Sequence, residues 1–169
     1  GLSLGAGPAP HAPLRVRACA TASKALGGFG GIVPGDRDFV EKVKTRSHWF
    51  RGASAPPPPV AAATAKGLEI AAAEPPLRQR LWRNARLLKS SLRAMGLEAD
   101  DTPVPIVSLA LGDEANMRRI QSALMDRGVA IAHMHYAGLG PHGALRIAVF
   151  ATHTEEMIGR LVEELRRVV

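Results

Sequence analysis

The chain has 169 residues, of which 46% are hydrophobic, so it is long and apolar enough to build a core. Its 22 Lys and Arg residues outnumber its 15 Asp and Glu residues, which gives a formal net charge of +7. The single cysteine, Cys19, excludes an intrachain disulfide and favours a reducing compartment, so we expect a cytoplasmic protein, and no apolar run approaches the roughly 20 residues that span a bilayer.

The first part of the chain centres on a lysine among small residues. Residues 1–17 are rich in Gly, Pro and Ala, which predicts an irregular segment. Short apolar stretches at 16–20 and 31–33 predict two strands, and Lys24 lies between them, next to small polar residues and a glycine pair. A lysine that is shielded from water loses its proton more easily and can form a Schiff base with a carbonyl. Glycine amides can approach an anion closely, so this segment predicts a site for an aldehyde cofactor that carries a phosphate.

The middle of the chain is predicted to be helical. Residues 36–45 form an amphipathic pattern that begins near Asp36, and the Ala-rich stretch 60–73 follows a run of prolines that can start a helix. A third helix carries one apolar stripe that ends before Gly96. Its opposite face predicts a solvated basic surface, made of Arg78, Arg83, Arg86, Lys89 and Arg93.

The C-terminal part predicts a small sheet with helices on one face. A strand is expected at 105–111, a helix at 113–127, strands at 129–135 and 144–150, and a last helix that begins after Thr152 or Thr154. This order of strand, helix, strand, strand and helix is typical of a small α+β domain.

Several blocks of the sequence occur in the order in which the alpha-oxoamine synthases have them. They are 21–31 (TASKALGGFGG), 53–57 (ASAPP), 80–85 (RLWRNA), 145–147 (LRI) and 151–154 (ATHT). Over about residues 18–169 the chain resembles the C-terminal part of this family of pyridoxal-phosphate (PLP) enzymes, which condense an amino acid with an acyl-CoA and release carbon dioxide. The resemblance implies an α/β, fold-type I PLP transferase, with a small α+β domain that has a short, mostly antiparallel sheet.

The resemblance also implies a domain organisation. The irregular segment 1–17 would be followed by the cofactor-lysine end of the large PLP domain at 18–58. A helical connection at 59–96 would then lead to the small C-terminal domain at 97–169. We expect the segment to be incomplete on its own, because the family's catalytic unit is about twice as long and the residues that pair with the cofactor ring are absent.

The resemblance implies roles for five residues. Lys24 would bind PLP covalently and move a proton at the substrate, and the hydroxyls of Thr21 and Ser23 would contact the cofactor. Arg146 would hold the carboxylate of the amino acid, since a guanidinium fits a carboxylate with two hydrogen bonds. Ser54 would reach the phosphate of a neighbouring subunit.

The sequence argues against metal binding and against nucleic-acid binding. His133 and His135 alternate on a predicted strand, but no carboxylate or cysteine lies at ligand spacing, so we expect no metal site. The basic charge comes without a recognised nucleic-acid motif, so we expect neither nucleic acid nor membrane as a partner.

The expected partners are an amino acid, an acyl-CoA, and a second copy of the chain or a missing N-terminal domain. The alternatives are another fold-type I PLP enzyme, such as an aminotransferase, and a noncatalytic interaction subunit.

Overall fold

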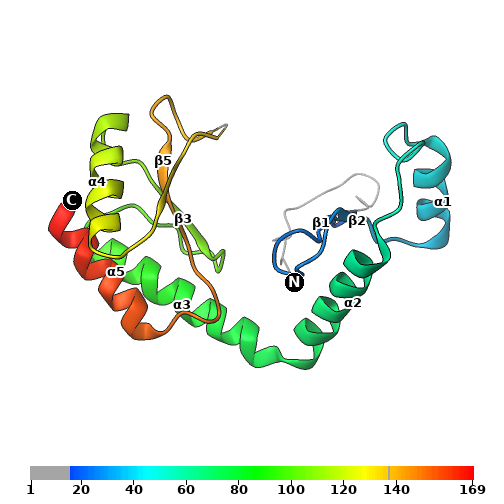
Figure 1. Cartoon of the computed structure of the whole chain (residues 1–169), viewed down its shortest axis with the longest axis horizontal. Helices are drawn as coiled ribbons and strands as arrows, with labels where there is room; N and C mark the ends of the chain where they lie inside the picture. Colours follow the sequence, from blue (N-terminus) through cyan, green and yellow to red (C-terminus); the bar gives the residue numbers. More distant parts are fainter. Residues whose placement is uncertain (1–15, 137) are drawn as a thin grey trace, which may run out of the picture. The chain divides into compact units, whose positions relative to one another are not determined.

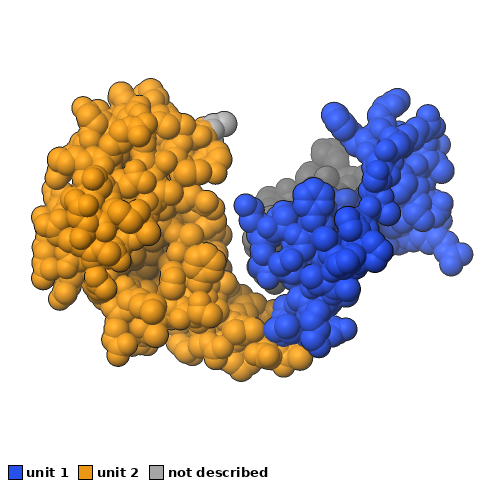
Figure 2. Space-filling model, viewed as in Figure 1, with its two compact units in different colours: residues 1–72 blue, residues 73–169 orange. Residues whose placement is uncertain are grey.

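A computed structural model describes residues 16–136 and 138–169, so residues 1–15 of the predicted irregular segment lie outside the described residues. The chain divides into two compact units, residues 1–72 and 73–169 (Figure 2). The boundary falls at the last residue of the first of two helices in the stretch predicted as a helical connection. Among the described residues, no helix is both long and apolar enough to cross a lipid bilayer.

The first unit contains a small hairpin and two helices. Strands β1 (Ala20–Thr21) and β2 (Gly31–Ile32) pair antiparallel, followed by α1 (Arg37–Arg46) and α2 (Pro58–Ala73) (Figure 1). Asp36 caps α1, because its carboxylate accepts a hydrogen bond of 2.8 Å from the Phe39 amide. The predicted start of this helix near Asp36 is therefore confirmed. No residue of either helix is buried within this chain.

The second unit is an α+β domain around one sheet. Its elements are α3 (Pro75–Ala94), β3 (Ile106–Leu109), α4 (Glu114–Asp126), β4 (Ala132–Met134), β5 (Ala144–Ala148) and α5 (Glu155–Val168). The strand order is β3-β5-β4, and both pairs are antiparallel, with Ser108 and Ala132 flanking Arg146. The predicted small antiparallel domain is therefore confirmed, although each strand is shorter than expected because pairing stops where the chain turns.

Helix boundaries in this unit follow the capping residues of the sequence. Asp113 and Thr154 cap α4 and α5 through side-chain oxygens that accept backbone amide hydrogens. Gly96 follows α3 with a φ of 79°, and the next amide, of Leu97, donates to the Leu92 carbonyl at 3.0 Å. A left-handed glycine ends a helix in this way without steric strain.

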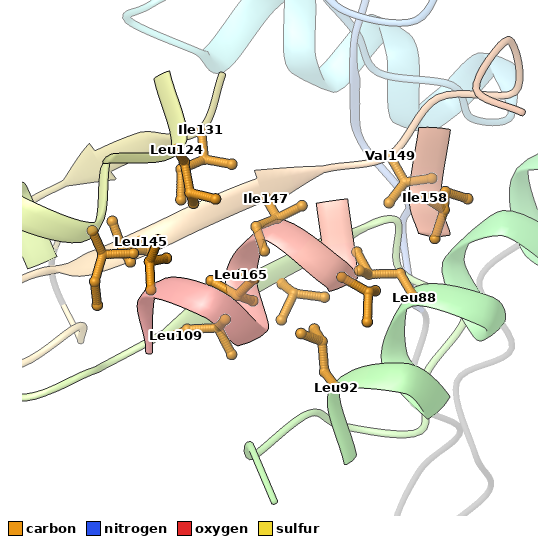
Figure 3. Packing of buried hydrophobic residues seen from close by; sticks show 14 of the residues in the cluster. Leu88, Leu92, Leu109, Leu124, Ile131, Leu145, Ile147, Val149, Ile158 and Leu165 are labelled. Carbon is orange, nitrogen blue, oxygen red and sulfur yellow. The ribbon is translucent and has the colours of Figure 1, made fainter. Parts of the chain in front are cut away.

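The hydrophobic core of the second unit lies between the sheet and its helices. Leu145 and Ile147 of β5 point into it, where they meet Leu88 of α3 and Leu165 of α5 (Figure 3). Leu88, Leu145 and Leu165 are fully buried. The alternation along β5 places Leu145 and Ile147 on the core side, and therefore Arg146 on the opposite face of the sheet.

The prediction that α3 carries a solvated basic face is wrong at one position. Lys89 is only 2% exposed, whereas its basic neighbours on that helix are exposed. Its ammonium donates hydrogen bonds to the Asp100 carboxylate at 2.7 Å and to the Thr102 carbonyl at 2.8 Å. Because a buried charge is costly unless it is paired, this cluster ties α3 to the loop that leads into β3.

A buried asparagine ties α3 to the other end of the sheet. Asn84 donates from its amide to the carbonyls of Phe150 and His153, at 3.1 and 2.7 Å. These carbonyls belong to the connection between β5 and α5, so one side chain satisfies two backbone acceptors there.

Candidate functional site

Lys24 lies in the loop of the β1–β2 hairpin. The Ala22 amide donates to the Gly30 carbonyl at 2.9 Å, and the Gly28 amide donates to the Ala22 carbonyl at 2.9 Å. Gly27 follows with a φ of 63°, which only glycine adopts readily, and its amide donates to the Lys24 carbonyl at 3.1 Å. The glycine pair therefore closes the tight loop that carries the lysine.

The two hydroxyls predicted to contact the cofactor lie next to each other at the start of this loop. Thr21 and Ser23 are joined through their hydroxyl oxygens at 2.7 Å, and the Thr21 hydroxyl also lies 3.3 Å from the Gly30 carbonyl. The Ser23 amide donates to the Thr21 hydroxyl at 3.2 Å. This local turn shows that Thr21 has a structural task in the hairpin, in addition to any contact with a ligand.

The lysine loop packs on α2 through two glycines. A Cβ on Gly28 would lie 1.8 Å from the Thr64 hydroxyl oxygen, and a Cβ on Gly67 would lie 2.6 Å from the Leu26 carbonyl oxygen. Neither position has room for a side chain while the loop keeps its place. The helix that follows the proline run therefore supports the loop that carries Lys24.

We expect Gly67→Ala to displace this loop, because the new Cβ would collide with backbone that cannot rotate away. Amide hydrogen exchange at Ala22 and Gly28 should become at least about tenfold faster, which corresponds to roughly 1.4 kcal/mol of local stability. The matched control is Gly159→Ala in α5, where an added Cβ meets no atom within 4 Å. That change should stabilise its helix by up to about 1 kcal/mol. Unchanged exchange at Ala22 and Gly28 would contradict the supporting role of α2.

The Lys24 side chain is exposed in this chain. The shielding that we expected from the sequence is therefore not supplied by the described residues, and it would have to come from protein that lies outside them. The free thiol of Cys19 is also exposed and lies just before β1. Within the first unit, the hairpin thus presents one amine and two hydroxyls on a single loop.

Arg146 lies on β5, on the face of the sheet opposite the hydrophobic core. It is half-buried, and among the residues that the structure describes it forms no ion pair. Its neighbours in register, Ser108 and Ala132, are small, so they leave the guanidinium accessible beside them. A planar cation held in a strand in this way can accept a carboxylate through two hydrogen bonds.

The other predicted site residues are placed separately. Ser54 lies in the exposed segment between α1 and α2. His153, which belongs to the sequence block 151–154 and was not predicted as a site residue, lies just before α5, and its ring accepts a hydrogen bond of 3.3 Å from the Phe150 amide. Lys89 and Asn84 were missed as interacting residues, because their partners lie 11 to 69 positions away in the sequence.

The sequence matches the model of the aminotransferase class I and II family over residues 5–165. Two curated relatives are the 8-amino-7-oxononanoate synthases of Symbiobacterium thermophilum and Bacillus pumilus, each 32% identical, over 150 and 148 residues. The matches cover 88% and 85% of this chain but only 38% of each relative. The chain therefore spans well under half the length of these relatives.

The fold is similar to that of a serine palmitoyltransferase solved with a PLP internal aldimine. The TM-score is 0.78 and the sequence identity is 27%, over 89% of this chain and 38% of the other. The matched 89% of the chain includes residues of both units, so the fold-type I assignment is confirmed.

Proposed function

Because the chain belongs to the aminotransferase class I and II family, and within it to the alpha-oxoamine synthases, we propose that it is the C-terminal part of a PLP-dependent acyltransferase. The complete enzyme would condense an amino acid with an acyl-CoA and release carbon dioxide. Residues 18–58 would form the end of its large domain, 59–96 a helical connection, and 97–169 its small domain.

The strongest support for this proposal is the arrangement of three side chains. Lys24 and Ser23 lie on a glycine-closed loop that Thr21 of β1 precedes, within a stretch that is similar in sequence to 8-amino-7-oxononanoate synthases. An amine and two hydroxyl groups form a donor set that fits an aldehyde with a phosphate group. Lys24 would hold the cofactor covalently, and Thr21 and Ser23 would orient it.

Bound PLP would supply an electron sink that stabilises negative charge at the substrate α-carbon. The residues of this chain would then have distinct tasks. The Lys24 amine would take up and return the α-proton, because it is the basic group of the loop. Ser54 would contact the phosphate in a neighbouring subunit, which makes a homodimer or a separate N-terminal part the expected partner.

We propose that Arg146 binds the carboxylate of the amino-acid substrate. In the active enzyme, Arg146→Lys should weaken amino-acid binding about tenfold or more, because a lysine cannot form the paired hydrogen bonds of a guanidinium. Cofactor binding should stay almost unchanged. The measurement is the dissociation constant of the amino acid, compared with that of PLP, by titration of the cofactor absorbance.

The matched control is Arg160→Lys, since Arg160 lies on α5 and donates to the Arg127 carbonyl at 2.6 Å. It should leave amino-acid affinity unchanged. Equal loss of amino-acid and cofactor binding in Arg146→Lys would indicate a structural arginine instead. An unchanged amino-acid affinity would remove Arg146 from the site.

The experiment that tests the proposed function is a substrate comparison on the chain combined with the N-terminal part of the enzyme. Release of carbon dioxide that requires both an amino acid and an acyl-CoA supports the acyltransferase. Amino-group transfer to a 2-oxo acid, without any need for acyl-CoA, would identify an aminotransferase. If the assembled protein binds no PLP and shows no visible cofactor absorbance, the chain is a noncatalytic interaction subunit.

A further inference from the structure

The second unit gathers three potential metal ligands from separate elements. Glu114 opens α4, and His133 and His135 lie on and just after β4. One ligand atom from each residue lies within 4.8 Å of the other two. From this juxtaposition we infer that Glu114, His133 and His135 form a binding site for a divalent transition-metal ion of the zinc type.

The Glu114 carboxylate is already oriented for such a role. Arg118 donates two hydrogen bonds to its Oε1, from Nε at 2.8 Å and from Nη2 at 2.6 Å. The other oxygen, Oε2, lies 3.7 Å from Nε2 of His135. The hydrogen bonds of Arg118 lower the pKa of the Glu114 carboxyl, which favours the ionised form that binds a metal. Ligating carboxylates in metal sites are commonly held by a hydrogen bond of this kind.

The two histidine rings are also arranged as metal ligands are. Nε2 of His133 lies 2.9 Å from the His142 carbonyl oxygen, which can only accept, so this nitrogen carries the proton. The other nitrogen of the neutral ring then keeps its lone pair for a metal, which is the usual pattern for a histidine ligand. The ring centroids of His133 and His135 are 4.9 Å apart.

A glycine keeps the space beside both rings open. A Cβ on Gly143 would lie 3.1 Å from Nε2 of His133 and 3.2 Å from Nδ1 of His135, and 2.5 Å from the Met134 carbonyl oxygen. The backbone of Gly143 has a φ of 73°. A side chain at this position would collide with the Met134 carbonyl and crowd both rings, and its backbone would be strained, so the close approach of the chain to the two histidines depends on glycine here.

The ligand chemistry selects the metal. Two imidazoles and one carboxylate suit zinc and its neighbours, whereas Mg²⁺ and Ca²⁺ prefer oxygen ligands alone. A tetrahedral zinc ion with bonds of about 2.0–2.2 Å holds its ligands roughly 3.3 Å apart, so the side chains must close in slightly. His135 is exposed and can make that adjustment, and water would complete the fourth position.

The test is a titration of the 169-residue chain with Zn²⁺ alone, followed by calorimetry. We expect one saturable site that is weakened at least about tenfold by His135→Gln, by His133→Ala and by Glu114→Gln. The matched controls are His142→Ala, which keeps the carbonyl that contacts His133, and His48→Ala in the first unit. Both controls should bind Zn²⁺ as the unchanged chain does. Binding that survives the three cluster variants, or that is lost equally in the controls, would overturn the inference.

A second measurement needs no variant. Zn²⁺ should protect His135 from modification by diethyl pyrocarbonate, measured by peptide mass spectrometry, and should leave the exposed His48 equally reactive. It should also raise the thermal midpoint of unfolding, since an ion that binds only the folded state stabilises it. Equal modification of His135 with and without Zn²⁺ would contradict the site, even if the cluster variants did not fold.

Discussion

Lys24→Ala is expected to abolish covalent attachment of PLP and to reduce the activity of the assembled enzyme by several orders of magnitude. The amine would be both the attachment point of the cofactor and the group that moves the α-proton, so one substitution removes two functions. The measurement is borohydride reduction of the PLP-loaded protein, followed by peptide mapping. In the unchanged protein, the label should be found on the peptide that contains Lys24.

The other lysines of the chain are internal controls in the same experiment. Lys66 pairs with Glu69 at 3.1 Å on the surface of α2, and Lys44 pairs with Glu41 at 3.1 Å on α1. Lys66→Ala should leave both labelling and activity unchanged. A label found mainly on Lys42, Lys44, Lys66 or Lys89 would reject Lys24 as the cofactor lysine.

Asp100→Ala is expected to lower the free energy of unfolding of the second unit by about 3 kcal/mol. The substitution leaves the Lys89 ammonium buried without its carboxylate, and loss of one partner of a buried pair costs about 3–5 kcal/mol. We expect the lower end of this range, because 58% of the Asp100 side chain is exposed and water screens part of the interaction. The measurement is chemical denaturation followed by circular dichroism.

The neighbouring residue offers a matched control. Asp101 also pairs with an arginine of α3, Arg93, at 3.4 Å, but its side chain is 93% exposed. Asp101→Ala should therefore change the unfolding free energy by less than about 0.5 kcal/mol. Adding Lys89→Met to Asp100→Ala should recover part of the lost stability, because no buried charge then remains. Equal effects of the two single aspartate variants would contradict the special role of the buried lysine.

The same pair predicts how stability depends on pH. Hydrogen bonds from Lys89, and then those from Thr102, lower the pKa of the Asp100 carboxyl below its ordinary value of 3.8. A lowered carboxyl pKa stabilises the folded state at pH values above the ordinary pKa, and this stabilisation is lost as the pH falls toward the lowered pKa. The unchanged chain should therefore lose more stability between neutral and acid pH than Asp100→Ala does.

Much of the fold could be predicted from local sequence signals. The start of α1 at Asp36, the end of α3 before Gly96 and the stripe of α5 each depend on residues within one or two turns. Capping and helical periodicity act over that range, so they are visible without a structure. The limits of the strands were less accurate, because a strand ends where its partner ends, and that partner is distant in sequence.

The candidate sites likewise combine features that local sequence signals predict with features that depend on distant contacts. The order of the elements and the family follow from the sequence alone, because hydrophobic periodicity, capping and contiguous motifs such as residues 21–31 are local properties. The resemblance to that family then implied the small antiparallel domain. Three features are visible only in the folded chain: Lys89 is buried, α2 supports the lysine loop, and Glu114 lies near two histidines that are 19 and 21 positions further along. Each of these depends on packing between distant segments, where a buried charge or a steric contact is fixed by neighbours that sequence spacing does not reveal.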